Sequence, residues 1–176
     1  MTLQNATQQL ISQLSATYEG REAVNIAEWV MEKLTGWGRM DRVINKEVVL
    51  SALQEQRLEQ YTNELLQHRP VQYVLEEAWF AGMRFYVNEN VLIPRPETEE
   101  LVEWIVNDDR RPTTDDRKIL DIGTGSGCIP IALKKKFQQA DVFACDISEA
   151  ALERECQELN KRFFTFHTKK EALYHT

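Results

Sequence analysis

The residues best suited to chemistry in this sequence form a glycine-rich turn, Gly123-Thr124-Gly125-Ser126-Gly127, directly after an apolar run. Glycines at alternate positions let the backbone turn tightly and let its amides approach a ligand closely. Asp121 stands just before this turn, and Asp146 ends the next apolar run. A carboxylate in the position of Asp146 can accept both hydrogen bonds of a ribose diol. The pattern therefore predicts an adenosine-binding site.

The spacing of the glycines helps to choose between adenosine cofactors. The dinucleotide fingerprint needs a third glycine, or sometimes an alanine, three places after the second. Counted from Gly123 and Gly125, that place holds Cys128, whose side chain would crowd the helix against the strand. The observed Asp-x-Gly-x-Gly-x-Gly resembles the first motif of S-adenosylmethionine methyltransferases instead. An NAD-dependent oxidoreductase and a plain glycine turn with a surface aspartate stay open as alternatives.

The segments around the turn predict an α/β unit. Residues 118–122 form a short apolar strand, a helix follows Gly127, and residues 141–146 form a second strand. Ser148 can cap a further helix, and residues 163–166, Phe-Phe-Thr-Phe, are a candidate third strand. This alternation implies parallel strands joined by crossovers. We therefore expect the first half of a Rossmann-like sheet, about three of its roughly six or seven strands.

The region before this unit predicts two further parts. Residues 1–70 carry apolar side chains at helical spacing and predict a helical bundle. Residues 71–95 predict a β-hairpin linker with a glycine turn at Gly82. A helix begins at Pro96, because proline is favoured at the first helical position. Residues 96–176 are then the partial α/β domain.

Some details of the helices follow from the same spacing. Asn45 is a candidate N-cap for a helix that includes Val48 and Val49. Trp29 and Trp104 fall at the spacing of helix residues that face a core. We therefore expect both tryptophans to be packing residues.

Three segments resemble those of the bacterial glutamine methyltransferases that modify peptide chain release factors. They are residues 69–75, residues 92–99 and residues 121–129, which read Arg-Pro-Val-Gln-Tyr-Val-Leu, Leu-Ile-Pro-Arg-Pro-Glu-Thr-Glu and Asp-Ile-Gly-Thr-Gly-Ser-Gly-Cys-Ile. Three motifs in the right order are more specific than any one of them. The resemblance runs from about residue 20 to about residue 160.

The resemblance implies a helical N-terminal domain that helps to hold the release factor and a C-terminal domain that binds S-adenosyl-L-methionine. The implied reaction is N5-methylation of the glutamine in the Gly-Gly-Gln motif of the release factor. Gly123 to Gly127 would wrap the methionine end of the donor beside Asp121, and Asp146 would take the ribose hydroxyls. Five residues at a helix start would lie near the mouth of the cofactor and substrate site, although a helix start alone also explains their types. These are Arg95, Pro96, Glu97, Thr98 and Glu99.

The catalytic motif of that family, Asn-Pro-Pro-Tyr, is absent from the sequence, in which no two prolines are adjacent. Acceptors in that motif hold the glutamine NH₂ in line with the methyl sulfonium. We therefore assign no catalytic residue and expect the chain as given to be an inactive fragment. The alternatives are a ribosomal-protein glutamine methyltransferase, a nucleic acid amino-methyltransferase, and a non-catalytic module that still binds a release factor.

Composition narrows the classes of partner. The 176 residues carry a formal net charge of −7, which argues against a broad basic surface for nucleic acid and favours a protein partner or a small ligand. The three cysteines lack metal-ligand spacing and the three histidines are scattered, so no metal site is expected. There is no signal peptide pattern and no run of the roughly 18 apolar residues that a membrane span needs. We expect a cytoplasmic protein without direct nucleic acid or membrane contacts.

Overall fold

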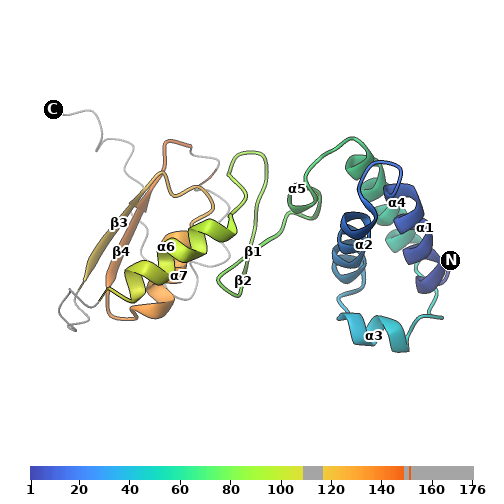
Figure 1. The fold of residues 1–176 in the computed structure, drawn as a ribbon, viewed down its shortest axis with the longest axis horizontal. Helices are drawn as coiled ribbons and strands as arrows, with labels where there is room; N and C mark the ends of the chain where they lie inside the picture. The colour runs from blue at the N-terminus through green and yellow to red at the C-terminus, as the bar shows by residue number, and fades with distance from the viewer. Residues whose placement is uncertain (109–116, 149–150, 152–176) are drawn as a thin grey trace. The chain divides into compact units, whose positions relative to one another are not determined.

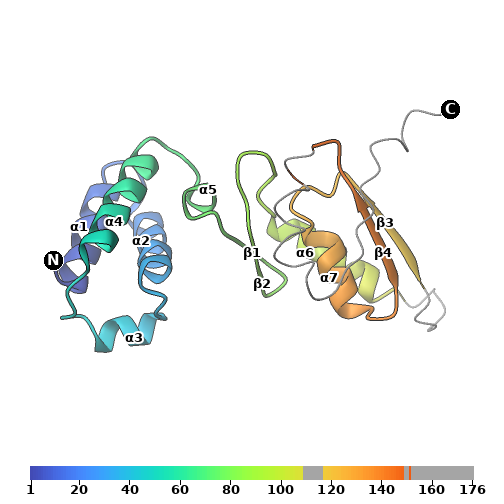
Figure 2. The ribbon, with the colours of Figure 1, turned by 180° about the vertical axis from the view of Figure 1, so that it is seen from behind.

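The computed structural model describes residues 1–108, 117–148 and 151. The chain divides into two compact units, Met1–Leu75 and Glu76–Thr176, which are drawn in Figures 1 and 2. The functional division of the chain at residues 70 and 95 stays a prediction. Among the described helices, none is both long enough and apolar enough to cross a membrane.

The first unit is helical, as its sequence predicts. Its helices α1, α2 and α4 pack against one another, and α5 packs against α2 and α4. Their apolar stripes meet in a core whose members include Leu10, Leu14, Val30, Met31 and Leu65, each at most 1% exposed. The helices of this unit are α1 (Leu3–Leu14), α2 (Gly20–Thr35), α3 (Arg39–Ile44), α4 (Ala52–Leu66) and α5 (Val71–Leu75).

Local side-chain chemistry explains where the long helices begin and end. Ser51 Oγ accepts the amide of Gln54 at 3.3 Å, and Gln54 Oε1 accepts the amide of Ser51 at 3.0 Å, which together form a capping box before α4. Thr2 Oγ1 accepts the amide of Asn5 at 3.3 Å before α1. Gly36 ends α2 in the left-handed conformation, with φ +71°.

The expectation of a helix that is capped by Asn45 and includes Val48 and Val49 is wrong. Asn45 is the C-cap of α3, and α4 begins later in the chain. The carbonyl of Val48 accepts the amide of Leu3 at 2.8 Å, and Val49 forms an antiparallel bridge with Thr2. The segment is extended because it pairs with backbone groups that the first turn of α1 leaves without a helical partner.

The second unit begins with the expected hairpin, which joins β1 (Ala78–Phe80) to β2 (Met83–Phe85). The strands are antiparallel, with Ala78 opposite Phe85. Ala81 and Gly82 both have positive φ, +48° and +69°, as a two-residue type I′ turn requires. The hairpin at Gly82 is therefore confirmed, although it is shorter than the alternation of the sequence predicts.

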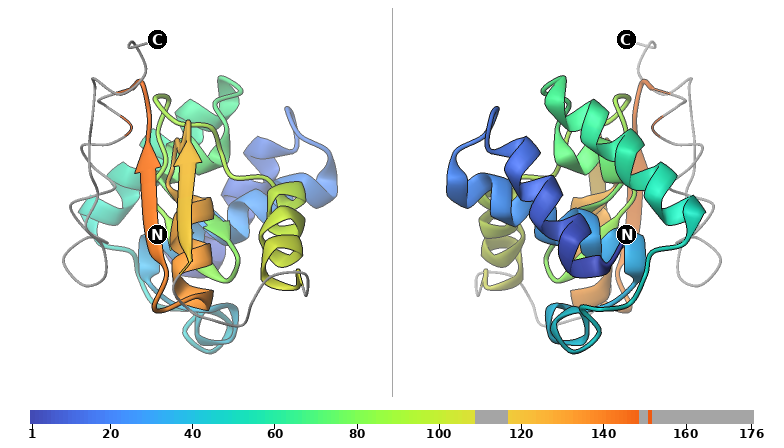
Figure 3. Two further views of the ribbon diagram at one scale, coloured as in Figure 1. Left: turned by 90° about the vertical axis from the view of Figure 1, so that its left-hand side faces the viewer. Right: turned by 90° about the vertical axis from the view of Figure 1, so that its right-hand side faces the viewer.

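The α/β part contains α6 (Pro96–Val106), β3 (Lys118–Ile122), α7 (Cys128–Lys136) and β4 (Asp141–Cys145). The strands β3 and β4 are parallel neighbours, seen side by side in Figure 3, with Ile122 opposite Cys145. The helix α7 connects them and packs against both, and α6 packs against α7. This is the β–α–β unit of a Rossmann-like fold, as the sequence predicts. The expected third strand at residues 163–166 lies outside the described residues.

The two faces of the strand pair differ. Both α6 and α7 lie on one side of it (Figures 1 and 3). On that side Val142 and Ala144 are buried beneath α7 together with Leu133. On the other side Leu120 and Ile122 of β3 are 61% and 64% exposed.

The expectation that Trp29 and Trp104 are packing residues is wrong. Trp29 is 47% exposed on α2, and Trp104 is 79% exposed on α6. The inward stripe of α6 consists of Val102 with Ile105 and Val106 instead. Helical spacing groups residues into faces, but it does not decide which face meets the core.

Candidate functional site

The glycine turn leaves the end of β3 and enters α7. Gly123, Gly125 and Gly127 have φ values of +76°, +52° and +68°, which glycine adopts without steric cost. At Gly123 and Gly125, apart from the chain neighbours, no described atom lies within 4 Å of the place that a Cβ would take. The backbone conformation therefore selects glycine at these positions, and the space beside the turn is open to a ligand.

Backbone hydrogen bonds hold the turn against the end of β4. The carbonyl of Cys145 accepts the amides of Gly123 at 2.8 Å and of Thr124 at 3.1 Å. The carbonyl of Thr124 accepts the amide of Gly127 at 3.0 Å, which closes the turn before α7 begins. The turn is thus organised by the protein's own contacts.

Asp146 links the turn to the chain that follows β4. Its Oδ2 accepts the amide of Gly125 at 2.8 Å, and its Oδ1 accepts the amide of Ser148 at 2.9 Å. Ser148 Oγ in turn accepts the amide of Ala151 at 3.2 Å, which is the helix cap that the sequence predicts. A carboxylate has about four acceptor directions, so Asp146 keeps capacity for a ligand hydroxyl.

Two buried polar atoms beside the turn have no hydrogen-bond partner, Asp121 Oδ2 and Thr124 Oγ1. Thr124 is 8% exposed. A buried polar atom without a partner costs roughly 1–3 kcal/mol, so such atoms are rare unless a ligand or water completes them. An acceptor and a hydroxyl left open at one turn suit a ligand that carries an ammonium group and a hydrogen-bonding anion.

The start of α7 adds a partial positive charge to the same place. Gly127 is its N-cap and makes no side-chain cap, so backbone amides at this end stay available to a negatively charged group. Cys128, the first residue of α7, is buried, and burial raises the pKa of its thiol, an effect that the nearby Asp121 carboxylate increases. The thiol therefore stays protonated near neutral pH and is unsuited to a nucleophilic role.

The residues Arg95 to Glu99 are placed at the start of α6. Arg95 is the N-cap and Pro96 is the first helical residue, and Glu97 and Glu99 lie in the first turn, where carboxylates are favourable to the helix dipole. Thr98 donates its amide to the carbonyl of Arg95 at 3.0 Å. No described hydrogen bond joins this group to the glycine turn, so its place at the site mouth stays a prediction.

Two family models match this chain. The PrmC N-terminal domain matches residues 5–75, and the Methyltransferase small domain matches residues 98–176. A release factor glutamine methyltransferase of Flavobacterium psychrophilum is 41% identical over 153 residues, which are 86% of this chain and 54% of that protein. One of Bacteroides thetaiotaomicron is 41% identical over 79% of this chain and 49% of its own length. The chain belongs to the release factor glutamine methyltransferase family.

The family matches cover both units of the structure, and the resemblance drawn from three short motifs is confirmed. The chain spans about half the length of these curated relatives. A solved structure of coclaurine N-methyltransferase bound to N-methylheliamine and SAH has a TM-score of 0.37 and 16% identity, over 94% of this chain and 48% of that chain.

Sequence reasoning missed the backbone partners of the site. The Cys145 carbonyl and the Ser148 amide hold the turn and Asp146 in place. No residue type announces such contacts, because every residue offers the same backbone groups. The parallel register of β3 and β4 could have indicated them, since it places Ile122 beside Cys145.

Proposed function

We propose that this chain binds S-adenosyl-L-methionine and supplies the donor-binding and partner-binding parts of a protein-glutamine methyltransferase. The substrate would be the glutamine of the Gly-Gly-Gln motif in peptide chain release factors, methylated at N5. One observation carries the proposal: the glycine turn is docked on β4 and Asp146, with two buried polar atoms left open beside it. The names of the relatives supply the substrate class.

The residues present fit this cofactor. Asp121 Oδ2 is an open buried acceptor suited to the α-ammonium of the methionine part, and Thr124 Oγ1 can bond the carboxylate. The open space at Gly123 and Gly125 admits the chain of the ligand. Asp146 stands at the end of β4 with lone pairs free for ribose hydroxyls. When bound, the cofactor supplies a methyl group on a positively charged sulfur.

The chain's own residues bind and orient in this scheme. Asp146 holds Gly125 and so ties the turn to the next strand, which keeps the binding amides in place before a ligand arrives. The sequence contains no Asn-Pro-Pro-Tyr, and no residue here is given the task of holding the glutamine NH₂. We therefore expect donor binding without methyl transfer by this chain alone.

The proposed partner is a release factor, held in part by the helical unit, which matches the PrmC N-terminal domain. Release factors act on ribosomes, so we propose a cytoplasmic location. A ribosomal-protein or nucleic acid methyltransferase would use the same kind of turn. The names of the relatives disfavour both alternatives, and the net charge of −7 also disfavours nucleic acid.

Calorimetric titration with S-adenosylhomocysteine, and separately with NAD, tests the cofactor. We expect S-adenosylhomocysteine to bind and NAD not to bind. Asp146→Ala should weaken binding by about 30-fold, because both a ligand acceptor and the Gly125 contact are lost, at roughly 1–3 kcal/mol for such groups. Asp141→Ala is the matched control, since this exposed carboxylate lies at the opposite end of β4.

Binding of NAD in place of S-adenosylhomocysteine would overturn the cofactor assignment. A second titration with an intact release factor tests the partner. Release factor binding without any cofactor binding would favour the non-catalytic module. Methyl transfer to a release factor by the unaided chain would contradict its expected inactivity.

A further inference from the structure

The helix α3 presents an apolar face to solvent. Met40, Val43 and Ile44 are 71%, 60% and 73% exposed, and their spacing of three and four residues places them on one side of the helix. We call these three residues the α3 face. Isolated exposed apolar side chains are ordinary, but three on one turn of helix indicate a surface that another molecule covers.

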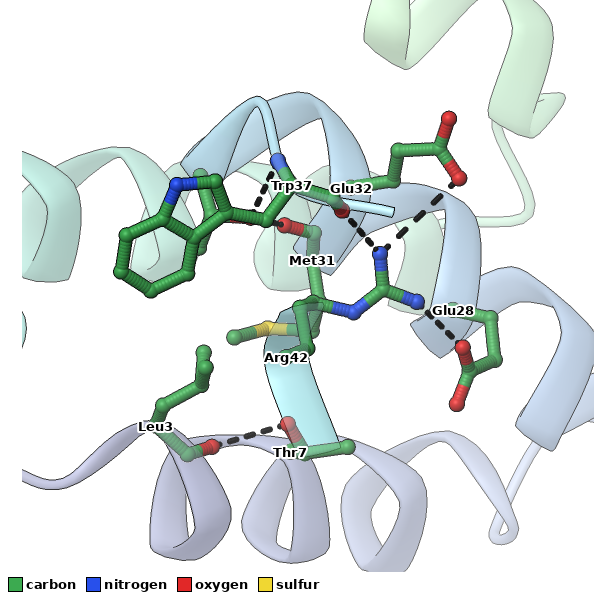
Figure 4. Close-up of polar contacts among 8 residues, drawn as sticks. Leu3, Thr7, Glu28, Met31, Glu32, Trp37 and Arg42 are labelled. Atoms are coloured by element: carbon green, nitrogen blue, oxygen red, sulfur yellow. Dashed lines mark hydrogen bonds and ion pairs between the residues drawn. The ribbon is translucent and has the colours of Figure 1, made fainter. Parts of the chain in front are cut away.

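The helix contributes none of its residues to the core of the helical unit, and Arg42 is its one buried residue. Figure 4 shows the Arg42 guanidinium extending towards α2, where it forms an ion pair with Glu28 and lies 3.9 Å from Glu32. It also donates to the carbonyl of Trp37 at 2.6 Å. Arg42 is 8% exposed.

This arrangement is informative because a buried cation is expensive to desolvate. Apolar residues pointing inward would have attached α3 more simply. The helix instead spends its apolar side chains on solvent and is held by a charged anchor. Arg42 therefore fixes the orientation in which the α3 face is presented.

The size of the surface limits what can cover it. Even with the exposed neighbours Val48, Val49 and Leu53, it has six apolar side chains, whereas a stable interface uses roughly 20–30 residues a side. A permanent dimer needs more than this. A small apolar surface suits a partner that must leave after it has been modified, and apolar residues at helical spacing are what apolar grooves of other proteins receive.

We propose that the α3 face docks into an apolar groove on the folded body of the release factor, away from the Gly-Gly-Gln loop, and that Arg42 is its positioning residue. The inference rests on the proposed function for its partner. It assigns the partner contact to one short helix, and it predicts that an isolated Gly-Gly-Gln peptide gains nothing from this contact.

The test measures binding of the full chain to an intact release factor and, separately, to S-adenosylhomocysteine. Met40→Gln/Ile44→Gln should weaken release factor binding by about tenfold, as expected when two central apolar contacts are lost. Its affinity for S-adenosylhomocysteine should not change. The matched control is Val24→Gln/Leu66→Gln, which alters two exposed apolar residues, 40% and 37% exposed, elsewhere in the helical unit.

Arg42→Met tests the anchor. It should weaken release factor binding and speed hydrogen exchange in α3, and Arg42→Lys should restore part of the binding. Release factor binding at the original affinity by Met40→Gln/Ile44→Gln would overturn the proposal, as would an equal loss in the control.

A change in sedimentation by that double variant with unchanged release factor binding would assign the α3 face to a second copy of the chain and overturn the proposal. If the unaltered chain binds no release factor, the inference fails, while the titration with S-adenosylhomocysteine still decides the cofactor assignment.

Discussion

The two units of this chain use their residues differently. In the helical unit, Leu14 and Leu65 are fully buried in a core that three helices close. In the α/β unit, the strand pair is covered by helices on one side only, and Leu120 and Ile122 are exposed on the other. The α/β unit also holds strained glycine positions and buried polar atoms without partners.

This difference separates residues that stabilise from residues that bind. Positive φ values and open polar atoms cost free energy in the unit that carries them, and they persist where a ligand uses them. The helical unit has little of this around its core, and its exception is α3, which is held by Arg42 outside the core. We therefore expect substitutions in the helical core to affect stability, and those at the glycine turn to affect binding.

The largest expected effect is in the helical core. Leu14→Ala should lower the free energy of unfolding by about 3 kcal/mol, because it removes a fully buried side chain and leaves a cavity. Leu120→Ala, at a 61% exposed position of β3, should change it by less than about 0.5 kcal/mol. Urea unfolding followed by far-ultraviolet circular dichroism measures both. A cost for Leu120→Ala equal to that of Leu14→Ala would show that this face of β3 is covered in solution.

Arg42→Met should cost about 2 kcal/mol, because Glu28 loses its partner. This is less than the roughly 3–5 kcal/mol of a fully buried pair, since Glu28 is 32% exposed and water still reaches it. Urea unfolding again measures the effect. Arg39→Met, at an exposed position of the same helix, is the control and should be nearly neutral. An equally mild Arg42→Met would mean that α3 needs no anchor.

Gly125→Ala sharpens the comparison from the α/β side. A side chain at φ +52° should cost about 1–2 kcal/mol and weaken S-adenosylhomocysteine binding, although the space for a Cβ is open. Gly20→Ala, at the start of α2 with ordinary φ and open space, should be neutral or slightly stabilising and leave binding unchanged. Thermal unfolding and calorimetric titration give the two readouts. Unchanged binding in Gly125→Ala would remove the turn from the site.

The smallest expected effect is at a helix cap of the helical unit. Ser51→Ala should cost about 1 kcal/mol, because both hydrogen bonds of the capping box before α4 involve this residue. Ser15→Ala removes only an exposed bond to the carbonyl of Ile11 at the end of α1, and it should be close to neutral. The two variants are compared by urea unfolding. A neutral Ser51→Ala would mean that α4 is held by its packing alone.

Much of the fold could be predicted from local pattern. Apolar periodicity identified the helical bundle, the turn at Gly82 identified the hairpin, and Pro96 marked the first residue of α6. These features depend on neighbours in sequence, so short windows contain the information. The failures are long-range. Val48 is extended because its carbonyl meets the first turn of α1, 45 residues earlier, at Leu3.

The candidate site divides in the same way. Glycines 123, 125 and 127 were predicted because backbone sterics at each residue decide φ, and the matched family motif follows the same residues. The sequence by itself also determined the family and the acid at the end of β4. Only the tertiary structure decided that Asp146 reaches the amide of Gly125, 21 residues away, and that Asp121 Oδ2 is buried without a partner. Conformation is set by local sterics, whereas partners and burial depend on which segments the parallel sheet brings together.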